Sequence, residues 1–466
     1  MSGSAGDGFP PPDLGRRSGS VSKRIASNTG LLLGAKIIAT LLGIATLKIA
    51  TDSLTAAEFG TIVFIHAYML FFNEVASFHS WQTIIRFGTD DITENRPDRL
   101  ARLFKFAYTL DGISAIAGFV LAIATFGLVA RLAEFIPGLT PENGVSIDRL
   151  RDIINIYCIL ILFRFTSASI GIFRLFDRFT VLAVEALVMP VVRLSGAIIA
   201  ASMGAGLTGF VAAWFVGSLV QYVFTWLAGF IELSRRGMFR RTFAARLRFF
   251  RPERPLWPFV IKSNVDATIA TGFSHLPQLL VMAVFGPVWN GVYKIAEEVA
   301  KLLTEGFKLL DQVIYPELAK LVSERRTDRI WKIVTRAALV LLAVGFAFCI
   351  ALALFGRVVL SSIFGPSYGE AVPLALLLVP AAALLGAAAP LYPIFYATDR
   401  PGGAILVRGS SLLIYLVTFG AAAVLIGRLA PGVAMIAANA FAVVTLMIVT
   451  PRVLKAAHQR HMSGTP

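Results

Sequence analysis

The sequence has few charged residues and few cysteines for its length. Only 15% of its 466 residues are Asp, Glu, Lys or Arg, whereas 56% are hydrophobic. A soluble domain cannot bury that much apolar surface, so the composition excludes a soluble globular protein. The two cysteines, Cys158 and Cys349, lie in apolar stretches, which argues against a disulfide framework or a cysteine metal cluster.

Sequence signatures of enzymatic chemistry are also missing. The chain has no phosphate loop, no glycine-rich dinucleotide motif and no set of His and Cys at metal-binding spacing. We therefore expect no enzymatic activity, no cofactor and no bound metal.

Long apolar stretches are what the chain has instead. A bilayer core of ~30 Å requires about 20 apolar residues per helix, and the sequence supplies roughly twelve such stretches. The predicted fold class is therefore an all-α integral membrane protein. The predicted spans are residues 27–50, 61–85, 104–130, 152–173, 179–201, 207–231, 259–284, 288–317, 332–356, 371–397, 403–427 and 432–451.

Lys and Arg alternate between loops in a way that predicts the orientation. When the bases at the span ends, such as Lys105, Lys332 and Arg336, are counted with the loops that they adjoin, 29 of the 43 Lys and Arg residues lie in the two tails and the even-numbered loops, and five lie in the odd-numbered loops. Cytoplasmic loops carry the excess of positive charge, so both termini are predicted to be cytoplasmic. This bias, together with attraction to anionic lipid headgroups, accounts for the net charge of +15 without nucleic-acid binding.

Weak internal repeats suggest two lobes of six helices each. Arg102 and Lys105 open the third span as Arg329 and Lys332 open the ninth, and Gly60 matches Gly291. Two parallel repeats are related by a pseudo-two-fold axis along the membrane normal, an arrangement typical of alternating access. The predicted domains are a disordered cytoplasmic tail (1–24), an N-terminal lobe (25–232), a basic cytoplasmic linker (233–256), a C-terminal lobe (257–455) and a cytoplasmic tail (456–466).

Charged residues inside the spans are the candidate functional residues. A charge in hydrocarbon costs ~2.5 kcal/mol or more, so these side chains should face a wet cavity or each other. Lys48 lies near a span end and can reach water. The predicted substrate-binding bases are Lys36, Arg164, Arg193, Lys262, Lys294, Lys301, Lys308 and Arg408. The predicted residues for ion coupling or charge pairing are Glu74, Asp111, Glu185, Asp266, Glu297, Glu298 and Glu305.

The eighth span carries the densest set of charges. Lys294, Glu298, Lys301, Glu305 and Lys308 recur at spacings of three and four, which places them on one helical face. That face either lines a cavity, forms a ladder of ion pairs, or lies at the membrane interface. A base-rich interior favours a bulky anionic substrate, because Arg and Lys bind phosphate groups well.

Several short motifs then resemble those of a known family. Together with the twelve-helix plan, they are similar to polysaccharide flippases of the multidrug/oligosaccharidyl-lipid/polysaccharide exporter superfamily. At residues 77–81 the chain departs from the apolar turn that often ends the second helix of that family. The motifs are residues 56–60, 85–87, 291–296, 315–319 and 360–371.

The resemblance implies movement of an undecaprenyl-diphosphate-linked oligosaccharide across the bacterial cytoplasmic membrane, for O-antigen, exopolysaccharide or capsule synthesis. The implied partners are that anionic lipid-linked sugar, membrane lipids and a polysaccharide polymerase complex, with no nucleic acid. One alternative is a cation-coupled multidrug antiporter of the same superfamily, which would require an acidic cavity. Another is a membrane polysaccharide polymerase or ligase, for which the longest external loop, 131–151, is short.

Overall fold

The computed structural model describes residues 21–135, 146–247, 249–250, 252, 255–323, 327–388, 391–397 and 401–462. Within these ranges the chain forms helices and no β-strand. Eleven of the described helical segments are long and apolar enough to cross a membrane. The predicted all-α integral membrane fold is confirmed.

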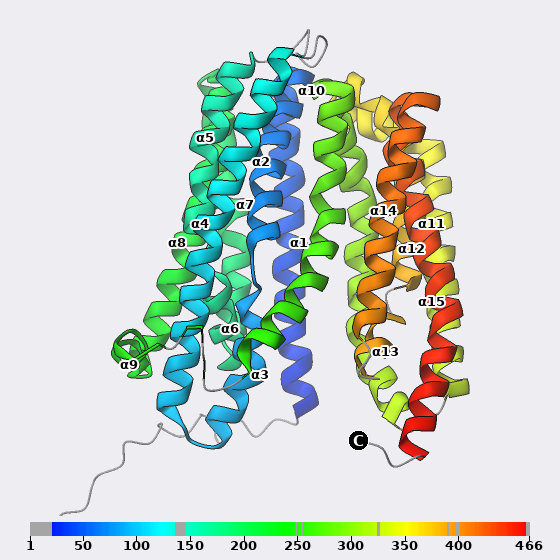
Figure 1. The fold of residues 1–466 in the computed structure, drawn as a ribbon. Coiled ribbons are helices and arrows are strands. Elements are labelled where there is room, and N and C mark those ends of the chain that lie inside the picture. Colours follow the sequence, from blue (N-terminus) through cyan, green and yellow to red (C-terminus); the bar gives the residue numbers. More distant parts are fainter. Residues whose placement is uncertain are drawn as a thin grey trace, which may run out of the picture. The chain divides into compact units, whose positions relative to one another are not determined.

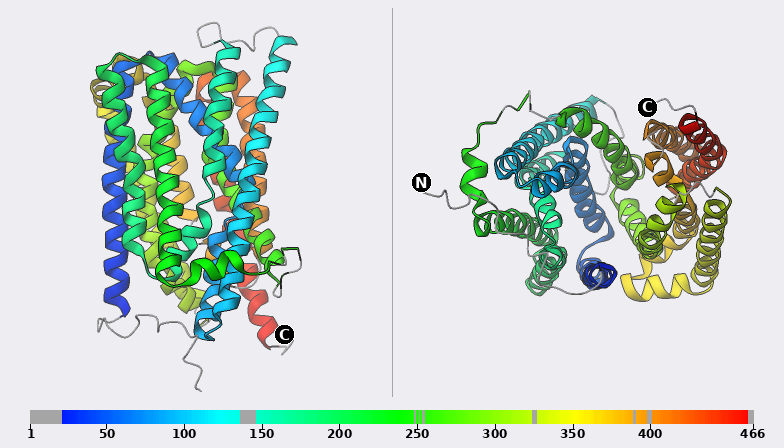
Figure 2. Two further views of the ribbon diagram at one scale, coloured as in Figure 1. Left: turned by 90° about the vertical axis from the view of Figure 1, so that its left-hand side faces the viewer. Right: turned by 90° about the horizontal axis from the view of Figure 1, so that it is seen from below.

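Residues 1–54 and 65–268 form one compact unit, here called unit 1. Its described helices are drawn from blue to green in Figure 1, and most of them appear nearly end-on from below in Figure 2, so they run close to parallel. They are α1 (Val21–Ser53), most of α2 (Ala56–Ala76), α3 (Ser80–Thr93), α4 (Pro97–Phe135), α5 (Ile147–Phe163), α6 (Ser167–Leu175), α7 (Phe179–Ser202), α8 (Gly206–Arg235), α9 (Met238–Ala244) and the start of α10 (Leu256–Ser323).

Residues 55–64 and 269–466 form the other unit, unit 2. It contains the start of α2 and most of α10. Its remaining helices are α11 (Thr327–Phe364), the 3-10 helix η1 (Pro366–Glu370), α12 (Ala371–Ala388), α13 (Tyr392–Ala397), α14 (Pro401–Leu425), η3 (Gly427–Leu429) and α15 (Ala430–Met462).

Helix α10 contains both the seventh and the eighth predicted spans. Its backbone leaves the helical conformation at Gly286, where φ is 79° and ψ is −178°. This φ lies in the region that favours glycine, so the residue ends one helix and starts the next. The break falls in the gap that the sequence predicts between residues 284 and 288.

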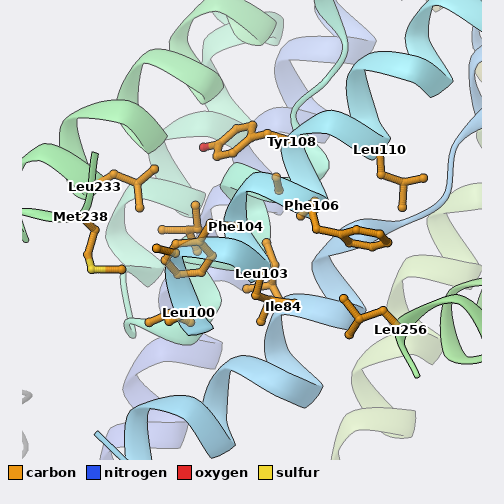
Figure 3. Close-up of a cluster of buried hydrophobic side chains, with 14 of the residues drawn as sticks. Ile84, Leu100, Leu103, Phe104, Phe106, Tyr108, Leu110, Leu233, Met238 and Leu256 are labelled. Carbon is orange, nitrogen blue, oxygen red and sulfur yellow. The ribbon is translucent and has the colours of Figure 1, made fainter. Parts of the chain in front are cut away.

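The predicted basic linker 233–256 packs within unit 1. Lys105 on α4 donates from Nζ to the carbonyl oxygens of Phe243 (2.8 Å) and Ala245 (2.7 Å), which ties the end of α9 to α4. An apolar cluster continues this contact: Figure 3 shows Phe104 of α4, Leu233 of α8 and Met238 of α9 gathered together. The two lobe boundaries themselves stay a prediction.

Apolar side chains on the outside of the helices are exposed, as a membrane fold requires. Leu41 on α1 is 62% exposed and Val424 on α14 is 87% exposed. Lipid tails are as apolar as these side chains, so the helices associate mainly through close van der Waals packing and internal hydrogen bonds.

Two glycines allow a close helix approach in unit 2. A Cβ added to Gly60 of α2 would lie 1.7 Å from the carbonyl oxygen of Pro287 and 2.9 Å from the nitrogen of Gly291. Asn290 also donates from Nδ2 to the carbonyl oxygen of Gly60 at 2.8 Å. The glycines that the repeat pairs along the sequence therefore contact each other in space.

We expect Gly60→Ala to destabilise the protein by about 1–3 kcal/mol, because the methyl group must push α2 and α10 apart. Gly43→Ala in α1 is the matched control, since a Cβ there meets no atom within 4 Å. Thermal unfolding in detergent measures both variants. A Gly60→Ala variant that unfolds at the wild-type temperature would contradict this packing.

Candidate functional site

Two breaks in unit 1 interrupt helices that the sequence predicts as continuous. Residues 77–79 separate α2 from α3, and residues 164–166 separate α5 from α6. His79 in the first break has φ 45° and ψ 47°, the left-handed conformation that non-glycine residues rarely adopt. Broken helices are typical of substrate and ion sites in transporters, because they expose backbone polar groups inside the membrane.

Polar side chains satisfy the backbone groups that the breaks release. Asp111 of α4 is buried, and its Oδ2 accepts the Ala168 N–H at 2.7 Å, so its carboxylate caps the start of α6. Ser167 Oγ accepts the Trp81 N–H at 3.1 Å, which joins the start of α6 to that of α3. The second and fourth predicted spans are therefore linked at their breaks.

An ion pair crosses from one break to the other. Arg164, which follows α5, donates from Nη2 to Glu74 near the end of α2. His79 Nε2 lies 3.4 Å from the second oxygen of the same carboxylate. The Arg164 side chain is 22% exposed and that of Glu74 is 17% exposed. The pair satisfies the charge of Glu74, while Arg164 Nη1 is buried without a hydrogen-bond partner in the described part of the chain.

Arg193 of α7 is the second guanidinium group in unit 1. Its Nη2 donates to Ser218 Oγ at 2.7 Å and lies 3.1 Å from His66 Nε2. His66 Nδ1 in turn lies 3.0 Å from the hydroxyl of Tyr157. The guanidinium carbon sits 5.7 Å from the Trp214 ring centre. All of these partners are uncharged or weakly basic, and no carboxylate among the described residues pairs with Arg193.

One face of α8 positions both guanidinium groups. Ser218 binds Arg193, and the Tyr222 ring centre lies 5.9 Å from the Arg164 guanidinium carbon. Gly217 leaves room for the Arg193 stem, because a Cβ at Gly217 would lie 2.4 Å from Arg193 Cγ. Gln221 donates from Nε2 to Glu185 of α7 at 2.6 Å. Residues 218, 221 and 222 are neighbours on a helix surface.

The described charges of the eighth span, at residues 294–301, form a ladder of ion pairs in unit 2. Lys294 Nζ lies 3.0 Å from Glu297 and 2.7 Å from Glu298. Lys301 Nζ lies 3.1 Å and 3.3 Å from the same two carboxylates. Side-chain exposure rises from 18% at Lys294 to 46% at Lys301. A cavity-lining role for this face stays a prediction.

The other predicted residues are scattered or lie outside the described side chains. Lys36 is exposed on α1. The Arg408 guanidinium carbon on α14 is 4.4 Å from the Tyr392 ring centre. Lys48 pairs with Asp52 at 2.6 Å near the end of α1. The side chains outside the described set are Lys262, Asp266, Glu305 and Lys308.

No group of three or more His, Cys, Asp or Glu among the described residues has the geometry to hold a metal ion. The neutral partners around the guanidinium groups were not predicted from the sequence: Tyr157, Ser218, Gln221 and Tyr222. For the three on α8 the signal is the recurrence of polar residues at spacings of three and four along an apolar helix, whereas no such spacing marks Tyr157 on α5.

Sequence comparison identifies the family. The profile described as "Polysaccharide biosynthesis protein" matches residues 53–373. The chain belongs to this polysaccharide biosynthesis protein family. The resemblance that the motifs suggest is thus confirmed at the level of the family.

A relative of this polysaccharide biosynthesis protein is the inner membrane protein YghQ of Escherichia coli (strain K12). The two are 30% identical over 352 residues, which cover 75% of this chain and 95% of YghQ.

Solved structures share the fold at low sequence identity. An inward-facing multidrug resistance MATE family transporter of the MOP superfamily aligns with a TM-score of 0.69 at 14% identity, covering 92% of this chain and 98% of that one. The lipid II flippase MurJ, in an inward closed conformation, gives 0.63 at 12% identity, covering 94% and 93%. A mutant of the Vibrio cholerae MATE transporter VcmN gives 0.61 at 11% identity, covering 94% and 98%. The polysaccharide biosynthesis protein thus has a membrane transporter fold.

The ion pair between the two breaks gives a stability prediction. Arg164→Met leaves the Glu74 carboxylate with only His79 beside it and should destabilise the protein by about 3 kcal/mol, because most of the compensating charge is lost. Adding Glu74→Gln to that variant removes the stranded charge and should restore most of the loss. Thermal unfolding of the two single variants and the double variant measures this coupling. Additive losses in the double variant would show that the two side chains do not interact.

Proposed function

We propose that the protein moves an anionic, lipid-linked oligosaccharide across the bacterial inner membrane. The observation that carries the proposal is Arg193, a half-buried guanidinium group in a membrane-spanning helix with no carboxylate partner among the described residues. A cation in that setting is costly unless an anion or water reaches it. The diphosphate that links a sugar to its lipid would supply the missing anion.

The surroundings of Arg193 suit such a cargo. A guanidinium group binds phosphate oxygens with two parallel hydrogen bonds. Ser218, His66 and the Tyr157 hydroxyl behind it hold the guanidinium group in place, and the buried Trp214 ring packs beside it, so the orientation of the group is fixed before an anion binds.

The transport cycle we infer is alternating access. The bound head group would be exposed first to one side of the membrane and then to the other, while the lipid tail stays in the bilayer. The family match to polysaccharide biosynthesis proteins and the fold shared with a lipid II flippase support this cargo class. The similarity to an inner membrane protein supports the location. Undecaprenyl diphosphate as the carrier lipid and a polymerase as a partner belong to the same proposal.

A cation-coupled antiporter is the rival function, because MATE transporters share this fold. An antiporter for cationic drugs would need a carboxylate free to bind them. Glu74, Glu297 and Glu298 are each paired with a base, and Asp111 caps α6. Glu185 is bonded to the neutral amide of Gln221 and is therefore the residue to which we assign any ion coupling.

Reconstitution tests the proposed function. In proteoliposomes, the wild-type protein should carry a lipid-linked oligosaccharide diphosphate to the opposite leaflet, as measured by accessibility to an added enzyme. We expect Arg193→Gln to slow this movement by about tenfold or more, because it removes charge-assisted hydrogen bonds to phosphate.

Lys48→Gln is the matched control, since it removes one positive charge near a helix end in the same unit. An Arg193→Gln variant as fast as the wild type would contradict the binding role. Transport of a cationic dye without transport of the lipid-linked sugar would favour the antiporter.

A further inference from the structure

An arginine-lined cleft lies in unit 1. It has a volume of about 490 Å³ and is bounded by the start of α4, the end of α9 and the residues that follow α9. Its charged lining consists of Arg99, Arg102, Arg241, Arg246, Asp91 and Asp98. Four guanidinium groups face two carboxylates, so the lining carries an excess of positive charge.

Two of the four arginines are available to a ligand. Arg99 and Arg246 are exposed, and neither has a hydrogen bond or an ion pair among the described residues. Asp91, by contrast, is 1% exposed and, like Arg102 and Arg241, has interactions within the chain. Asp91, Arg102 and Arg241 therefore stabilise the wall of the cleft, and Arg99 and Arg246 can bind a ligand.

The cleft is built on a fixed frame. Lys105 donates to the carbonyl oxygens of Phe243 and Ala245, and the cleft residue Arg246 directly follows Ala245, so this part of the cleft is anchored to α4. Buried Leu103 and Phe106 of α4 and Leu256 of α10 belong both to the cleft lining and to the apolar cluster in Figure 3. A site held in place before the ligand arrives loses less entropy on binding.

Exposed aromatic side chains lie on both sides of the cleft residues along the chain. Phe239 and Phe243 of α9 are 36% and 40% exposed, and Phe250 is 84% exposed. Figure 1 shows the short α9 end-on beside the upright α8, so α9 runs across the direction of the spanning helices. Aromatic and basic residues on a helix in this orientation are typical of the membrane–water interface.

We propose that this cleft binds the phosphate group of an anionic membrane lipid. The guanidinium forks of Arg99 and Arg246 match phosphate oxygens, and the exposed phenylalanines place the cleft at the depth of lipid headgroups. The Lys and Arg distribution predicts that this end of the protein faces the cytoplasm. The bound lipid would join α4 to the segment that leads from α9 into α10.

Lipid binding to the purified protein tests the proposal. The protein is placed in nanodiscs of phosphatidylcholine, and phosphatidylglycerol is titrated in. Native mass spectrometry counts the retained anionic lipid, and thermal unfolding reports its effect on stability. We expect Arg99→Gln with Arg246→Gln to weaken phosphatidylglycerol binding by about tenfold, and each single change to give an intermediate loss.

Arg235→Gln with Arg240→Gln is the matched control. Both of these arginines are exposed near α9 but do not line the cleft, and the charge change is the same. The control should bind phosphatidylglycerol as the wild type does. Equal weakening in both double variants would mean diffuse attraction to the bilayer and would overturn the site.

A competition arm separates a lipid headgroup from free phosphate. Inorganic phosphate at millimolar concentration should leave the retained phosphatidylglycerol unchanged, because the lipid is held at the membrane surface as well as by its phosphate. Loss of the lipid at that concentration would instead assign the cleft to a soluble phosphate ligand. Unfolding of the variants in pure phosphatidylcholine discs at the wild-type temperature confirms that they are folded.

Discussion

The need to stabilise two guanidinium groups inside a membrane fold shapes unit 1. Arg164 pairs with the carboxylate of Glu74. Arg193 instead contacts Ser218, the imidazole of His66 and the face of Trp214, and His66 in turn contacts the hydroxyl of Tyr157. Moving such a charge out of water is costly, so the surrounding helices must supply donors, acceptors and space. Gly217 supplies the space, and the polar face of α8 supplies the partners.

The helix breaks follow from the same constraint. A continuous α5–α6 helix would pair all of its backbone groups within itself. The break after Phe163 instead lets Arg164 reach Glu74, and it leaves the Ala168 N–H free for the Asp111 carboxylate that caps α6. Unit 2 shows a different solution on α10, where Lys294 and Lys301 are neutralised by Glu297 and Glu298 of the same helix. Among the described residues, Arg193 of unit 1 therefore has no carboxylate partner, whereas Lys294 and Lys301 of unit 2 each have two. This contrast is why we place the anionic cargo at Arg193.

The fold class and the charges inside the spans could be predicted from the sequence. The helix breaks and the contacts between helices could not, because they depend on residues far apart along the chain. Hydropathy gave the all-α membrane fold, and subtracting the loop charges left nine bases inside the spans, of which Arg164 and Arg193 are two and the lysines of the eighth span formed the densest group. The breaks at 77–79 and 164–166 were missed because long apolar stretches flank the few polar residues in them, so each predicted span still reads as continuous. The repeat paired Gly60 with Gly291 but could not predict their contact, which depends on how α2 meets α10. Residues 238–244 looked like part of a linker because a seven-residue helix leaves too short a pattern.

The central claim is that Arg193 recognises the diphosphate of the cargo, and a binding measurement tests it most directly. Native mass spectrometry can compare the affinity of the purified protein for a prenyl diphosphate and for the corresponding uncharged prenol. The account predicts that the wild type prefers the diphosphate by about tenfold or more, and that Arg193→Gln loses most of this preference. An undiminished preference in the variant would contradict the account.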